Sequence, residues 1–156
     1  MSNLLERSAA TLRVVLDTNV LVSALLYQDG GLKWLHDAWK EGRVVPLTDQ
    51  SVIDELRRIL VPLGAKKFQL DESAVGEIVA RYLGFTEAVP VDAEMDAPLP
   101  KCKDPDDQKF LELAQRGRSD VLVTSDGALL GLARRVSFRI LSPPKFTQYA
   151  LALEAR

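Results

Sequence analysis

The stretch Arg13-Val14-Val15-Leu16-Asp17-Thr18-Asn19-Val20-Leu21 decides the fold of this chain. Its first half is a short, mostly β-branched run that is typical of a strand. The run stops at Asp17, Thr18 and Asn19, which are residue types that favour turns and helix N-caps. Apolar residues then return at helical spacing from Val20 onward. The stretch therefore predicts a buried strand that passes directly into a helix, with an aspartate at the junction.

The same strand-to-helix order repeats along the whole chain. Further short apolar runs predict strands at residues 44–47, 86–91, 121–123 and 138–141. Apolar spacing predicts helices at about residues 20–25, 32–39, 50–60, 71–83, 104–115, 127–134 and 145–154. Pro62 and Gly64 are expected to end the third of these helices. Because strands that alternate with helices pair in parallel, the predicted fold class is α/β, a three-layer α/β/α sandwich around a central parallel sheet of about five strands.

Length and composition limit the classes of protein to which the chain can belong. A chain of 156 residues fits one domain, so residues 1–156 are predicted to form a single unit, with residues 1–11 as a flexible arm. With 47% hydrophobic and 27% charged residues, the composition is that of a globular protein. No apolar run is long enough to span a bilayer and the start lacks a leader pattern, so we expect a cytoplasmic protein without a membrane partner.

Acidic residues recur where the predicted strands end. Asp17 ends the first strand and Asp126 follows the fourth. The carboxyl ends of parallel strands meet at one edge of a sheet, which is where ligands bind in open α/β folds. Glu55 and Asp107 lie at the inner margin of two predicted helices, because each is three or four residues from apolar positions of the same helix. The spacing therefore predicts four carboxylates at one edge.

Carboxylates that converge in this way need compensation, since they repel one another and are costly to bury. No basic residue is identified at the neighbouring inward positions, so a divalent cation is the expected partner. Oxygen ligands favour Mg²⁺ or Mn²⁺, as one or two ions, whereas zinc usually takes the histidine or cysteine that only His36 and Cys102 offer here. Taken alone, each acid also has a structural interpretation as a helix cap, a turn residue or a solvent-facing group.

Four segments resemble the PIN-domain family, in particular its bacterial VapC-like group of toxins from toxin–antitoxin pairs. Val14-Val15-Leu16-Asp17-Thr18-Asn19 looks like the opening strand, the first acid and the polar pair behind it. Val52-Ile53-Asp54-Glu55-Leu56 matches the second acid, and Asp104-Pro105-Asp106-Asp107-Gln108-Lys109-Phe110 matches the third. Leu122-Val123-Thr124-Ser125-Asp126 is similar to the fourth. The resemblance spans about residues 13–142.

The resemblance implies a metal-dependent endoribonuclease that hydrolyses RNA phosphodiester bonds. The implied catalytic and metal-binding residues are Asp17, Glu55, Asp107 and Asp126, with Asp104 as a helper and with Thr18, Asn19 and Thr124 holding the acids. Because the net charge of −2 gives no overall attraction for RNA, local cations must bind it, and the candidates are Arg57, Arg58, Lys101 and Lys103.

The implied partners are an RNA substrate, an antitoxin protein and a second copy of the chain in a homodimer. Trp34, Leu35 and Trp39, together with the apolar row of the helix at residues 71–83, are candidates for such a partner surface, and core packing explains them equally well.

Other functions remain to be weighed against a ribonuclease. A catalytically silent PIN scaffold that binds RNA or protein is the non-enzymatic alternative. Phosphatases of the dehalogenase type need a second acid two residues after the first, and Asn19 occupies that position. Dinucleotide binding needs a glycine-rich loop after the first strand, and Asp17-Thr18-Asn19-Val20-Leu21 contains no glycine. These absences favour the nuclease.

Overall fold

The fold is built on a five-stranded parallel sheet, which we describe from a computed structural model covering residues 11–27 and 31–155. The strands are β1 (Leu12–Leu16), β2 (Val44–Thr48), β3 (Glu87–Ala88), β4 (Val121–Val123) and β5 (Arg139–Leu141). They lie in the order β3-β2-β1-β4-β5, and every neighbouring pair is parallel. The predicted α/β/α fold class is therefore confirmed. Most of the expected N-terminal arm, residues 1–10, lies outside the described residues.

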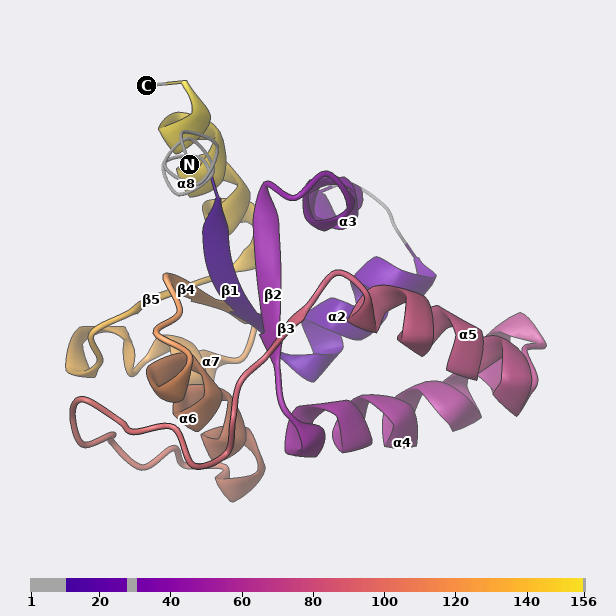
Figure 1. Cartoon of the computed structure of the whole chain (residues 1–156), viewed down its shortest axis with the longest axis horizontal. Helices are drawn as coiled ribbons and strands as arrows, with labels where there is room; N and C mark the ends of the chain where they lie inside the picture. The colour runs from indigo at the N-terminus through magenta and orange to yellow at the C-terminus, as the bar shows by residue number, and fades with distance from the viewer. Residues whose placement is uncertain (1–10, 28–30, 156) are drawn as a thin grey trace.

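Helices cover both faces of this sheet (Figure 1). On one side are α2 (Thr18–Leu26), α3 (Gly31–Lys40), α4 (Gln50–Phe68), α5 (Glu72–Leu83) and α8 (Pro143–Glu154). On the other are the 3₁₀ turn η1 (Pro105–Asp107), α6 (Gln108–Arg116), α7 (Gly127–Leu130) and the 3₁₀ turn η2 (Ala133–Arg135). Strand β1 serves both layers because its side chains alternate: Val14 and Leu16 pack into the first cluster and Val15 into the second.

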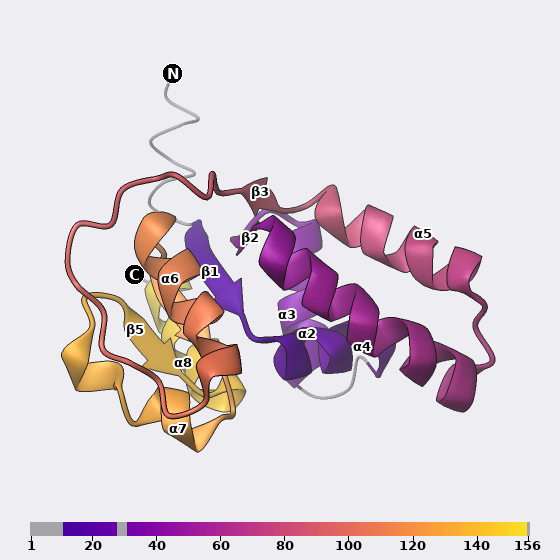
Figure 2. The same ribbon diagram turned by 90° about the horizontal axis from the view of Figure 1, so that it is seen from below.

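Helices α4 and α5 form an antiparallel pair that extends beyond the sheet (Figure 2). The expected end of α4 near Pro62 is wrong, because the helix continues to Phe68. Pro62 lies on the exposed side of the helix, where water can bind the carbonyl that loses its partner. Gly64 is buried instead, and a Cβ there would come within 2.9 Å of Val75 Cγ2. Glycine is therefore present for close packing of α5 on α4 and does not end the helix.

Other element boundaries also differ from those expected. The helix expected at residues 104–115 begins as η1 and becomes α-helical only at Gln108. The helix expected at residues 127–134 is divided into α7 and η2. The last helix starts at Pro143, because proline fits the first helical turn. None of the described helices is long and apolar enough to cross a membrane.

The aromatic residues of α3 belong to the core. Leu35 and Trp39 are each 2% exposed, and Trp39 packs edge-on against Tyr82 of α5 with ring centroids 5.1 Å apart. Trp34 is partly buried against Phe146 of α8. Core packing is therefore the correct interpretation for Leu35 and Trp39, whereas Trp34 is only half-buried and a partner surface there stays a prediction. In the apolar row of α5, Val75, Val79 and Tyr82 are buried, whereas Ile78 is half-buried.

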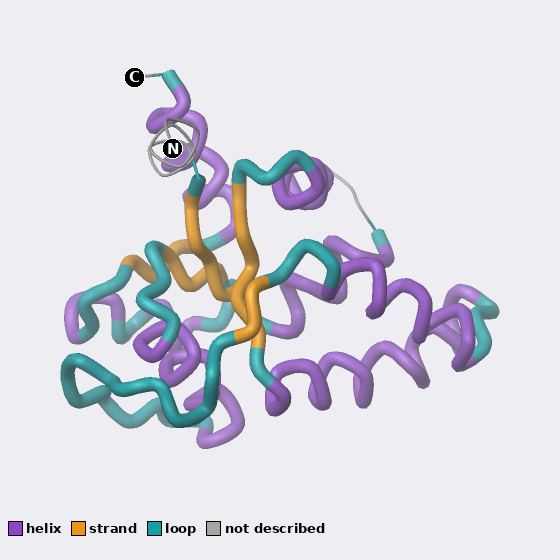
Figure 3. The backbone as a smooth tube through the Cα atoms, viewed as in Figure 1, coloured by secondary structure: helices purple, strands orange, loops and turns teal. Residues whose placement is uncertain are grey.

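A long loop joins β3 to η1 and runs past α6 (Figure 3). Val89, Leu99 and Cys102 of this loop pack into the apolar cluster beside α6. Gln108, the first residue of α6, binds the loop through both ends of its amide: Oε1 accepts from Cys102 N at 2.7 Å, and Nε2 donates to Pro100 O at 3.0 Å. These bonds fix the chain at η1, where Asp107 lies.

Candidate metal centre

Four acidic side chains from distant segments line one cavity of about 350 Å³ at the carboxyl ends of β1 and β4. Its lining consists of Asp17, Thr18, Asn19, Glu55, Ile59, Asp107, Phe110, Ser125 and Asp126. All four acids expected from the sequence are therefore brought to the expected edge of the sheet. Asp107 lines the cavity, whereas the adjacent Asp106 is exposed and does not.

Asp17 is fixed by the junction of β1 and α2. Its backbone N–H donates to Val123 O at 3.1 Å, which continues the pairing of β1 with β4. Its side chain caps α2, because Oδ1 accepts from Val20 N at 2.9 Å. Its other oxygen, Oδ2, accepts a hydrogen bond from the Thr124 hydroxyl. Burial raises the pKa of Asp17, and these hydrogen bonds only partly oppose that effect.

Thr124 connects Asp17 with Asp126. Its side chain is fully buried, and the hydroxyl that donates to Asp17 also accepts from Asp126 N at 3.0 Å. Asp126 in turn caps α7 by accepting from Ala128 N at 2.9 Å. One buried hydroxyl therefore sets the positions of two acids that follow different strands.

Asp107 and Asp126 behave as a coupled pair. Burial, the hydrogen bond to Asp126 and the charges of the surrounding aspartates raise the pKa of Asp107 to about 7. The same hydrogen bond lowers the pKa of Asp126. Because the pKa of Asp107 is raised and that of Asp126 is lowered, the pair retains one proton at pH values at which isolated aspartates are ionised. Its negative charge is thus incompletely compensated by the protein.

Glu55 has partners that the sequence did not reveal. Its Oε1 lies 2.5 Å from Lys109 Nζ, and its Oε2 accepts from the Thr18 hydroxyl. Burial would raise the pKa of Glu55, but the hydrogen bonds from Lys109 and Thr18 outweigh it and the pKa is lowered. The expectation that no basic residue lies near the acids is therefore wrong. Lys109 stands two positions after Asp107 on α6, and its long side chain reaches across to α4.

The remaining candidates are exposed. Asn19 lines the cavity with an exposed side chain. Asp104 is exposed outside the lining and caps η1, accepting from Asp106 N at 2.9 Å. The four cations proposed from the sequence to bind RNA are exposed, two on α4 and two in the loop before η1: Arg57, Arg58, Lys101 and Lys103.

The donor set suits a hard divalent cation such as Mg²⁺ or Mn²⁺, because every acidic group in the lining offers oxygen. Across residues 11–27 and 31–155, however, no three acidic, histidine or cysteine side chains already stand at the spacing of a complete coordination sphere. Binding an ion would therefore require side-chain movements.

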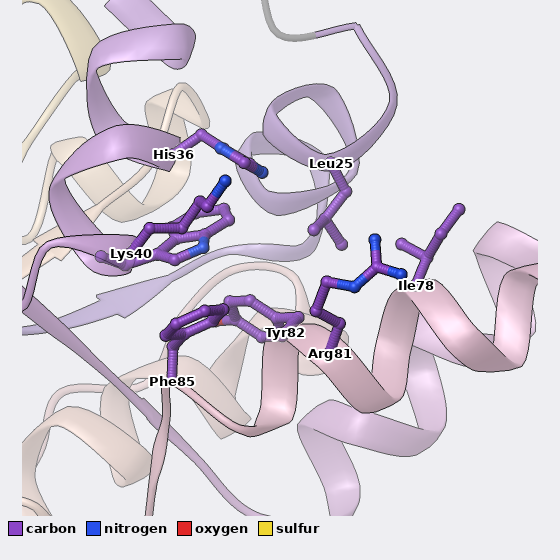
Figure 4. Close-up of a pocket in the computed structure, with 8 residues that line it drawn as sticks. Leu25, His36, Lys40, Ile78, Arg81, Tyr82 and Phe85 are labelled. Atoms are coloured by element: carbon purple, nitrogen blue, oxygen red, sulfur yellow. The ribbon is translucent and has the colours of Figure 1, made fainter.

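A second cavity, of about 270 Å³, lies between α2, α3 and α5 (Figure 4). It is lined by Leu25, His36, Trp39, Lys40, Ile78, Arg81, Tyr82 and Phe85. No acid is among these residues. His36, the chain's one histidine, is therefore on a different part of the molecule from the carboxylates and is not among the candidate metal ligands.

Comparison with known proteins agrees with this geometry. The profile of a family described as PIN domain matches residues 13–128, which include all four acids. The uncharacterized protein MJ1680 of Methanocaldococcus jannaschii is 26% identical over 121 residues, which cover 78% of this chain and 75% of that protein.

Two solved structures share the fold. The structure of VapBC2 from Rickettsia felis bound to a DNA fragment from their promoter matches with a TM-score of 0.51 and 17% identity, covering 83% of this chain and 97% of that chain. PAE2754 from Pyrobaculum aerophilum matches with a TM-score of 0.55 and 17% identity, covering 92% of this chain and 91% of that chain. At such identities the likeness concerns the fold alone.

Proposed function

The chain belongs to the PIN-domain family, and on that premise we propose that it is a metal-dependent endoribonuclease. The observation that carries the proposal is the gathering of four carboxylates, from segments far apart in the sequence, around one cavity whose negative charge is incompletely compensated. A cluster of this kind is costly in a protein that uses it only for structure. It is well suited to holding a cation against a phosphodiester.

In this proposal Asp17, Asp107 and Asp126 hold Mg²⁺ or Mn²⁺, and Glu55 completes the acidic set. The bound ion would activate water and neutralise charge on the phosphate during hydrolysis. The chain's own contribution is positioning. Thr124 orients Asp17 through its hydroxyl, and Thr18 does the same for Glu55.

The proposed RNA-binding residues are exposed cations on α4 and in the loop before η1. Arg57 and Arg58 lie on α4, the helix that carries Glu55, and Arg58 is close enough to lower the pKa of that acid. Lys101 and Lys103 lie in the loop that leads to Asp107. Local cations of this kind are needed because the whole chain, at a net charge of −2, does not attract RNA.

The biological role that we propose is that of a VapC-like toxin acting in the cytoplasm. The likeness to the VapBC2 structure supports an antitoxin as protein partner, and a homodimer is the proposed assembly. Co-purification of the chain with the product of a neighbouring gene, and its mass by light scattering, test the two partners separately. A monomer that retains no neighbouring gene product would contradict this role without affecting the nuclease.

The nuclease is tested with single-stranded RNA, in Mg²⁺, Mn²⁺ or EDTA. We expect cleavage only with the metals, and a loss of about a hundredfold or more in Asp107→Asn, since removing even an outer partner of a metal ligand costs about 10–100-fold. Asp106→Asn is the matched control, because it makes the same chemical change at the adjacent exposed residue. Cleavage in EDTA, or equal loss in both variants, would refute the proposal. RNA binding without cleavage would favour the silent PIN scaffold.

A further inference from the structure

The contact between Lys109 and Glu55 has a bearing on how many metal ions the cavity holds. Lys109 Nζ lies 2.5 Å from Glu55 Oε1, and the two side chains are only 20% and 15% exposed. A charge pair so shielded from water is held more firmly than a surface ion pair. The other oxygen of Glu55 accepts from Thr18, so both oxygens already have a donor.

This contact divides the four acids into two groups. Glu55 has a full positive charge beside it on the α6 side. Asp17 and Asp126 accept hydrogen bonds from the protein, and none of the three aspartates, Asp17, Asp107 and Asp126, has an ion pair among the described residues. These aspartates therefore carry at most three negative charges that no basic side chain of the described residues neutralises. One divalent ion compensates most of that charge, and a second would bring an excess of positive charge next to the ammonium group.

We propose that the ammonium group of Lys109 takes the place of a second divalent ion beside Glu55, so that the cavity binds one Mg²⁺ or Mn²⁺ and not two. This inference rests on the proposed function and specifies the metal content of the same site. Lys109 acts through Glu55 and is a positioning residue. It keeps the glutamate ionised and oriented at the cavity without drawing it into the coordination of a second ion.

The test is the number of Mn²⁺ ions bound per chain, measured on the purified full-length protein by calorimetry and by equilibrium dialysis. Wild type is expected to bind one ion. Lys109→Gln should bind a second ion, or bind the first at least about tenfold more tightly, because a positive charge near the site is removed. Lys109→Arg keeps the charge and should bind one ion like wild type.

Lys145→Gln serves as the matched control. It removes the same charge from an exposed position on α8, and should leave the number and affinity of bound ions unchanged. Binding of two ions by wild type would overturn the inference, whether or not the variants fold. A folded Lys109→Gln variant that binds Mn²⁺ like wild type would also overturn it. Absence of Mn²⁺ binding in every protein would instead overturn the proposed function itself.

Discussion

Replacing Thr124 by valine tests the hydrogen-bonded link between the two strand-end acids. Valine keeps the shape of threonine but has no hydroxyl, so Asp17 loses a donor and the backbone N–H of Asp126 loses an acceptor. A hydrogen bond to a charged group contributes about 1.5–3 kcal/mol, and an unpaired buried group costs about 1–3 kcal/mol. Because Asp126 is only partly buried, we take the lower part of the summed range. The expected loss of unfolding free energy is about 2.5–4 kcal/mol.

Urea unfolding at pH 8 in EDTA measures this loss, with Thr124→Ser as the matched control. Serine keeps the hydroxyl and removes one methyl group from a fully buried position, which costs about 1 kcal/mol. Valine should therefore be the more destabilising substitution, although it is the better space-filling match. If Thr124→Val unfolds at the same urea concentration as Thr124→Ser, or at a higher one, the hydroxyl does not stabilise Asp17 and the reasoning fails.

Three further predictions concern other parts of the molecule. In EDTA the melting temperature should fall as the pH rises from 5 to 8. The folded-state pKa of Asp107 is about 7, against 3.8 for the ordinary group, so the stability that its proton contributes is lost across that pH range. Excess Mn²⁺ should remove the decline, and a melting temperature that does not change with pH in EDTA would contradict the pairing of Asp107 with Asp126. Gly117→Ala should lower the free energy of unfolding in urea by about 1–3 kcal/mol. The added Cβ would come within 2.7 Å of Leu47 Cδ1 and 3.1 Å of Leu113 O. An unchanged free energy of unfolding would count against this packing. Pro62→Ala should stabilise the protein by about 1–3 kcal/mol, because it restores a hydrogen bond within α4, and a lower midpoint would show that the helix does not continue through Pro62.

Much of the fold is predictable because the apolar runs of the sequence are local signals. Both runs, one ending at Leu16 and the other at Val123, consist of consecutive apolar residues, as is typical of buried strands. In the structure the two strands pair in parallel. Helix ends were less predictable. Pro62 and Gly64 are helix-ending residues by intrinsic preference, but α5 packs on α4 beyond them, and tertiary contacts outweighed the local preference.

The candidate site shows the same division between local and distant information. Asp17 and Asp126 were identifiable because both follow strands, and the carboxyl ends of parallel strands share an edge. Lys109 was missed because two positions along a helix turn a side chain about 200° away from Asp107. Its ammonium group nevertheless reaches Glu55, since the lysine stem is long and α4 lies next to α6. Such a contact, between residues 54 positions apart, depends on tertiary packing that spacing does not encode.

The most direct measurement is a crystal structure of the protein grown or soaked with Mn²⁺, with the ion located by its anomalous scattering. We expect a peak in the acidic cavity, bonded to carboxylate oxygens of Asp17, Asp107 and Asp126, with Lys109 still paired to Glu55. A cavity without a peak at saturating Mn²⁺, or manganese bound only elsewhere on the surface, would contradict a metal centre at this edge of the sheet.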